Sequence, residues 1–171
     1  MTVTDNTITN KIWKLLEEVY DPEVPVLTVL DLGIIRNVEV QQTNEEEKII
    51  VTITPTYSGC PAMDVISMNI RMALLQNGYK NFEIKNVLSP AWTTDWMSEA
   101  GKQKLKSYGI APPSEKKVVC IPDAFAEEEA VQCPQCNSYN TVMISKFGST
   151  ACKALYKCSD CREPFDYFKC H

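Results

Sequence analysis

Two short cysteine pairs, CPQC at 133–136 and CSDC at 158–161, decide how the last third of this chain folds. Two residues separate the cysteines within each pair, and 21 residues lie between the pairs. This spacing lets both sulfurs of one turn face a single point, so two such turns supply the four ligands of a tetrahedral metal site. The predicted ligands are Cys133, Cys136, Cys158 and Cys161.

Zinc is the metal that this pattern favours, because a closed site of four thiolates is typical of structural zinc. The alternatives are a rubredoxin-type iron, an iron–sulfur cluster, redox-active dithiols, and two unrelated pairs of reduced cysteines. Residues 131–171 bury too little apolar surface to fold alone, and metal binding would contribute on the order of 10 kcal/mol. We therefore expect a small β module, a zinc ribbon, with strands near 141–147, 151–157 and Phe165.

The sequence before this module predicts an α/β domain in which helices pack against a small mixed sheet. The expected order is αββαβα, with helices at 7–20, 61–77 and 95–108 and strands at 35–41, 48–54 and 82–88. The expected division is a domain at 1–111, a linker at 112–130 and the ribbon at 131–171. A further short strand is expected at 116–121.

Composition excludes several classes of function. The formal net charge of −5 provides no basic footprint for nucleic acid. No apolar run approaches the ~18 residues of a membrane span, and the first ten residues lack the pattern of a secretory signal. We therefore expect a cytoplasmic protein, in which the eight cysteines serve metal or thiol chemistry rather than disulfides. The single histidine, His171, makes a catalytic triad improbable.

A second cysteine motif is TPTYSGCPAMD at 54–64, which runs from a predicted strand into a predicted helix. Gly59 permits a tight turn, and Pro61 suits the first helical position. Cys60 would then lie at or beside the helix N-cap, where the helix dipole favours its thiolate. Such a thiolate could hold iron, a cluster or a persulfide; simple packing of Cys60 is the alternative.

Three acidic residues, Asp21, Glu23 and Asp31, lie in predicted loops that could converge near Cys60. Their alternative role is turn formation and helix termination, which is favoured for Asp21 because it precedes a proline. The sequence assigns no role to Cys120, Cys152, Cys170 and His171, and packing is the favoured explanation for Cys152.

These motifs resemble known families over nearly the whole chain. DPEVPVLTVLDLG (21–33) and TPTYSGCPA (54–62) resemble the small iron–sulfur assembly domain shared by SufT and cytosolic iron–sulfur targeting factors. SPAWTTDWMSEAGKQKLKSYGIAPP (89–113) and the ending from Cys133 resemble the PaaD family, also called PaaJ, whose members belong to phenylacetyl-CoA epoxidase systems.

The resemblance implies the roles of individual residues. Cys60 matches the motif cysteine of the assembly domain, as the candidate thiol for a transient cluster, iron or sulfur. Glu23 matches the acid of the DPE motif, and Asp31 matches that of the DLG motif. The ribbon cysteines match the ending of the PaaD family.

The resemblance also implies an accessory subunit in aerobic phenylacetate degradation that matures or maintains an iron–sulfur or diiron centre and is not itself the catalyst. Its implied partners are a diiron oxygenase subunit, a structural subunit, and a reductase with flavin and a 2Fe–2S cluster. The alternative is a scaffold that binds these subunits through the ribbon and the Trp92/Trp96 region without handling metal. An independent thiol enzyme is disfavoured, because the sequence has no cofactor loop and no base partner for Cys60. The oligomeric state, a homodimer included, is left open.

Overall fold

The computed structural model describes residues 3–42, 47–113 and 131–169. These residues form three α-helices, a short 3-10 helix and two small mixed sheets. Their contacts divide the chain into two compact units, Met1–Ser98 and Glu99–His171. No helix within the described ranges is long and apolar enough to cross a membrane.

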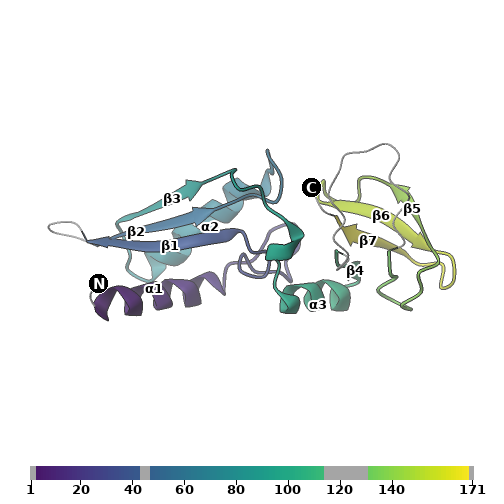
Figure 1. Ribbon diagram of the computed structural model, residues 1–171, viewed down its shortest axis with the longest axis horizontal. Helices are drawn as coiled ribbons and strands as arrows, with labels where there is room; N and C mark the ends of the chain where they lie inside the picture. The colour runs from purple at the N-terminus through teal and green to yellow at the C-terminus, as the bar shows by residue number, and fades with distance from the viewer. Residues whose placement is uncertain (1–2, 43–46, 114–130, 170–171) are drawn as a thin grey trace. The chain divides into compact units, whose positions relative to one another are not determined.

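The first unit has the predicted α/β order. Its elements are α1 (Val3–Leu16), β1 (Ile35–Gln42), β2 (Glu47–Ile53), α2 (Ala62–Gln76), β3 (Phe82–Asn86) and the 3-10 helix η1 (Thr94–Trp96). In the sheet order β1-β2-β3, β1 pairs antiparallel with β2, and β2 pairs parallel with β3. The parallel pair requires a crossover, which α2 supplies; Figure 1 shows α2 passing behind the strands.

The core of the first unit lies between the sheet and the helices. Apolar residues at helical spacing on α2 are almost fully buried, and so are the central residues of β2. The fully buried side chains of these elements include Ile12, Leu16, Ile53, Ile66, Ile70 and Leu74. Burial of each such side chain contributes about 1.5–3 kcal/mol.

The first helix ends earlier than the predicted residue 20. After Leu16 the backbone turns, and Tyr20 forms an antiparallel bridge with Thr28. The amide of Val29 donates to the carbonyl of Val19, so the backbone here serves the bridge rather than another helical turn. Because this pairing closes a short loop and leaves no mark on the apolar pattern, helical periodicity alone did not reveal it.

The predicted helix at 95–108 is two elements. The structure has η1 and then α3 (Glu99–Tyr108), with Met97 in an extended conformation between them. The amide of Ser98 donates to the carbonyl of Asp31 at 2.9 Å, and its hydroxyl donates to Asp31 Oδ1 at 2.9 Å. These bonds fix Ser98 outside a helix and explain the interruption.

The second unit contains the ribbon. Its sheet has the order β4-β7-β6-β5, with β4 (Ile110–Ala111), β5 (Thr141–Ser145), β6 (Lys153–Cys158) and β7 (Pro164–Phe168). The three ribbon strands were predicted, whereas β4, which pairs parallel with β7, was not. Accordingly α3 and β4 belong to the second unit, whereas we expected the first domain to extend to residue 111. The expected strand at 116–121 and residues 114–130 of the expected linker lie outside the described residues.

Candidate metal centre and the Cys60 turn

The four predicted ligands meet at one point of the second unit. Their sulfur atoms all lie within 4.8 Å of one another. The Sγ atoms of Cys133 and Cys161 are 3.7 Å apart, and those of Cys136 and Cys158 are 3.5 Å apart. These distances are too long for a disulfide, whose S–S bond is about 2.0 Å. They match the sulfur–sulfur edge of about 3.8 Å that follows from Zn–S bonds of about 2.3 Å in a tetrahedron.

Two similar turns place these sulfurs. The residue after each pair has a positive φ, 62° at Asn137 and 66° at Arg162. Asparagine adopts this conformation more readily than other residues with a side chain, whereas arginine rarely does. Asp160 joins the two turns, because it accepts hydrogen bonds from the hydroxyl of Ser138 and from the side-chain amide of Asn140. No local pattern signals this link, since it spans the whole hairpin between the pairs.

The ionisation of the four cysteines is linked to the binding of a cation. Backbone amides of Cys161 and Asp160 lower the pKa of Cys158 to about 7. The amide of Glu163 also lowers the pKa of Cys161, but burial and the three neighbouring thiols outweigh it and raise that pKa to about 12. Four sulfurs at these separations cannot all be thiolates unless a positive ion lies among them. The four residues therefore fit a metal ion, whose binding would displace the protons of the thiols.

An aromatic core supports the metal site. Tyr156 stacks on Phe165 with ring centroids 5.9 Å apart, and it meets Tyr167 edge-on at 5.6 Å. Cys133 and Cys158 are buried in the same cluster as these rings. The cluster is small, in keeping with a module whose folding depends on metal binding.

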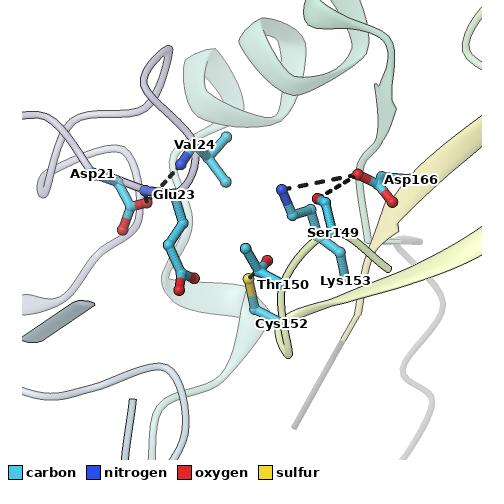
Figure 2. A network of polar contacts seen from close by, with 8 residues as sticks. All are labelled: Asp21, Glu23, Val24, Ser149, Thr150, Cys152, Lys153 and Asp166. Carbon is cyan, nitrogen blue, oxygen red and sulfur yellow. Dashed lines mark hydrogen bonds and ion pairs between the residues drawn. The ribbon is translucent and has the colours of Figure 1, made fainter. Parts of the chain in front are cut away.

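Cys152 and the loop after β5 form a separate polar region. Cys152 is buried, as expected, and its sulfur lies 3.0 Å from the hydroxyl of Thr150. Nearby, the hydroxyl of Ser149 donates to Asp166 at 2.8 Å, and Lys153 lies 3.9 Å from the same carboxylate (Figure 2). Cys120, Cys170 and His171 lie outside the described residues.

Cys60 directly precedes the first turn of α2. Pro61 occupies the N-cap position and Ala62 begins the helix, one residue later than the predicted start. Cys60 is half-buried, and its carbonyl accepts from the amide of Met63 at 3.3 Å. Gly59 has a φ of +85°, which makes the turn before Cys60 possible.

The pKa of the Cys60 thiol moves in the direction opposite to the one predicted from the helix dipole. Burial raises this pKa, and the negative charges of Glu23 and Asp21 raise it further. The amide of Ala62 and the hydroxyl of Tyr57 donate to the sulfur and lower the pKa, but they do not outweigh the other effects. Cys60 is therefore a protonated thiol near neutral pH, in a negative environment that favours a cation.

The acidic residues divide into two groups. The charges of Glu23 and Asp21 raise the pKa of the Cys60 thiol. Asp21 also forms the expected turn, because its Oδ1 accepts from the amides of Glu23 and Val24 at 2.8 and 2.7 Å (Figure 2). Asp31 is buried, and the hydrogen bonds of its carboxylate serve the fold.

Asp31 holds two segments together. Its Oδ2 accepts from the amide and the hydroxyl of Thr28, both at 3.0 Å, and its Oδ1 accepts from Ser98. Nearby, the indole of Trp92 is buried and donates to the carbonyl of Leu32 at 2.8 Å. The guanidinium of Arg36 lies over the ring of Trp96, 3.4 Å from its centroid. Trp92 is thus a core residue rather than a docking residue.

The sequence did not predict one buried polar atom of the 54–64 motif that contains Cys60. Thr54, which follows β2, is buried, and its hydroxyl has no hydrogen-bond partner within the part of the chain that the structure describes. A threonine at the end of a strand carries no signal of this in sequence, because burial of its hydroxyl depends on tertiary packing.

A small α/β domain with a thiol before a helix, followed by a four-cysteine ribbon, defines a class: iron–sulfur assembly domains joined to a zinc ribbon. Residues 9–81 match the family model of iron–sulfur cluster assembly proteins, and residues 120–169 match that of the PaaD zinc beta ribbon domain. An Escherichia coli K12 protein that is provisionally named as a component of 1,2-phenylacetyl-CoA epoxidase is 49% identical over 94% of this chain and 92% of its own length. The chain belongs to the PaaD family of phenylacetyl-CoA epoxidase subunits.

Two further similarities cover a little more than half of the chain. An Fe-S protein maturation auxiliary factor of Porphyromonas gingivalis is 40% identical, over 54% of this chain and 85% of its own length. A solved domain of unknown function (DUF59) from Bacillus anthracis superimposes with a TM-score of 0.54 at 28% identity, over 60% of this chain and 94% of that one. Together these relationships support an accessory role for the protein.

Proposed function

We propose that this protein matures or maintains a metal centre in partner subunits of the phenylacetyl-CoA epoxidase system, with Cys60 as the thiol that carries the cargo. The observation that supports this most directly is the half-buried Cys60 thiol before α2, in the negative field of Glu23 and Asp21. The names of the relatives, which include an epoxidase component and an Fe–S maturation factor, supply the setting.

The cargo is iron or an iron–sulfur cluster, handled as a substrate. On loading, the Cys60 S–H would release its proton to solvent as its sulfur replaces a water or small-thiol ligand of iron; on transfer, a ligand of the client would replace that sulfur, which takes a proton back from solvent. No electron transfer is needed for this exchange. Because the pKa of Cys60 is raised, the thiol is released readily as a neutral group once the cation has left. The negative charge of Glu23 supports retention of an iron ion, when that is the cargo, before transfer.

The ribbon metal has a different role, which is structural. We assign it as zinc held by Cys133, Cys136, Cys158 and Cys161, because the four thiols close the site and leave no ligand position for a substrate. Zinc supplies no redox chemistry there and holds the two cysteine turns together. The work of the protein takes place in the cytoplasm, where all of these thiols stay reduced.

The test is metal occupancy of the client in cells. The epoxidase subunits are co-expressed with the wild type or with Cys60→Ser, and iron and acid-labile sulfide are measured per client molecule. We expect Cys60→Ser to fold normally and to lower occupancy several-fold. Cys152→Ser, which removes a buried thiol of the ribbon unit, is the control and should leave occupancy unchanged.

A scaffold protein gives the opposite result. If the protein only binds the oxygenase or reductase, Cys60→Ser leaves client occupancy at the wild-type level, while deletion of the whole protein destabilises the complex. Full occupancy with Cys60→Ser would therefore exclude the carrier role.

A further inference from the structure

Helix α2 carries an exposed apolar stripe that the fold does not use. Val65, Met68, Met72 and Leu75 are between 47 and 57% exposed. Their spacing of three, four and three residues aligns them along one side of the helix. The buried residues of α2, such as Ile66 and Ile70, lie on the opposite side and fix the orientation of the helix. Within its own unit the stripe therefore faces solvent.

The chemistry of the stripe is that of a contact surface. Of the 15 residues of α2, only Asp64 and Arg71 are charged, although one full side of the helix faces solvent. A solvent-facing side of a helix is ordinarily rich in charge, and an apolar side rimmed by polar residues marks an interaction site. Two of the four stripe residues are methionines, whose flexible side chains adapt to different partner surfaces.

Size and position determine the kind of occupant. The stripe spans residues 65–75, about 15 Å at the helical rise, and four half-exposed side chains offer a few hundred Å². A stable dimer buries about 800 Å² on each partner, so this surface suits a transient contact. Its N-terminal residue, Val65, follows Cys60 by five residues, in the first turn of α2. A partner that lies along the stripe is thereby brought to the thiol.

We propose that the exposed stripe of α2 is the docking site for the client protein, which packs an amphipathic helix against it during transfer at Cys60. This inference rests on the proposed function and adds the surface by which the client is recognised. A helix is the expected occupant because apolar anchors three, four and seven residues apart match the spacing of the stripe, whereas a strand presents every second residue. With no charge inside the stripe, docking should depend little on salt concentration.

The chain contains suitable probes for a direct test. Two of its six methionines, Met68 and Met72, lie on the stripe, whereas Met63 and Met97 are buried. The protein is labelled at its methionine methyl groups and titrated separately with the metal-free oxygenase and the metal-free reductase. We expect the signals of Met68 and Met72 to move with one of them, and those of Met63 and Met97 to stay in place.

Substitutions at the stripe provide a second test of docking. Met68→Glu introduces a charge at an exposed position and should raise the Kd for the client at least about tenfold, as loss of a central anchor does. It should leave iron loading of Cys60 intact. Asn10→Glu adds the same charge on an exposed face of α1 and should change neither quantity. Met68→Leu retains the apolar surface and should bind the client with wild-type affinity.

Each outcome decides the inference. Complex formation without movement of Met68 and Met72, or a Met68→Glu variant with wild-type affinity, would overturn it. Movement of these signals with protein concentration alone, together with sedimentation as a dimer, would assign the stripe to a second copy and also overturn it. If Cys60→Ser abolishes transfer while Met68→Glu does not, the carrier role stands and the docking site fails; if neither variant has an effect, both fail.

Discussion

At the scale of single residues, Cys60 shows how neighbours distant in sequence set the chemistry of a thiol. The helix start predicts a lowered pKa, and the amide of Ala62 does act in that direction. Burial and the charges of Glu23 and Asp21 reverse the outcome. These neighbours belong to a loop nearly forty residues away, so the sequence could identify the thiol and its candidate acids but not the sign of their combined effect.

Glu23→Gln tests this electrostatic relation. Because the charge of Glu23 raises the pKa of Cys60, its removal lowers that pKa, increases the thiolate fraction at pH 8 and speeds alkylation severalfold. The rate is measured for the Cys60 peptide by mass spectrometry with iodoacetamide. Asp64→Asn removes an exposed carboxylate from the first turn of α2 and serves as the control. An unchanged rate with Glu23→Gln would show that Glu23 does not act on Cys60.

Gly33 provides a second test at this scale. Its φ is +67°, and a Cβ built there would lie 2.1 Å from the carbonyl oxygen of Trp96. Gly33→Ala should lower the free energy of unfolding by about 2–4 kcal/mol, since strain and backbone overlap add. Gly78→Ala, at a φ of +85° with open space around it, should cost only about 1 kcal/mol. Equal costs in urea unfolding would contradict the role of the overlap.

At the scale of elements, periodicity predicted the regular segments and failed where tertiary bonds intervene. The helices and strands of the first unit and the three ribbon strands were anticipated, since each has a clear apolar pattern. The break between η1 and α3 was not, because Ser98 is held by Asp31, which lies in another loop. The two-residue strand β4 was also missed, as its only signal is its pairing with β7.

Asp31→Ala tests whether the carboxylate of Asp31 stabilises the fold or takes part in iron loading at Cys60. Its carboxylate accepts two hydrogen bonds from Thr28 within the turn and one from Ser98, so its loss should lower the free energy of unfolding by about 2–4 kcal/mol. Ser98→Ala removes one of these bonds and should cost about 1 kcal/mol. Iron loading per folded molecule should stay the same in both variants. A stable Asp31→Ala variant that fails to load iron would instead make Asp31 a residue of the cargo site.

At the scale of the whole molecule, two compact units carry two different sulfur sites. The spacing of the ribbon cysteines predicted which four sulfurs lie together, because each turn is local. The hydrogen bonds of Asp160 that join the two turns had no such signal. The boundary between the two units was harder to predict from the sequence. By its contacts α3 belongs to the ribbon unit, although no break in the sequence pattern separates it from the α/β domain.

Metal removal from the full chain tests the independence of the two sites. A strong chelator should take about one zinc per chain and expose the amides of β5, β6 and β7 to rapid hydrogen exchange. Peptides from α2 and β2 should keep their protection, because their core contains no metal ligand. Added zinc should restore the ribbon. Slow exchange in all peptides after complete metal loss would show that the ribbon folds without the ion.

The most direct measurement is transfer from the isolated protein to its client. The wild type and Cys60→Ser are loaded anaerobically with iron and sulfide, mixed with the metal-free reductase or oxygenase, and followed by the absorbance and metal content of the separated client. We predict that the wild type fills the client faster than free iron and sulfide do, and that Cys60→Ser gives only the rate of the free ions. Equal transfer by both proteins would contradict the role of Cys60 as the carrier.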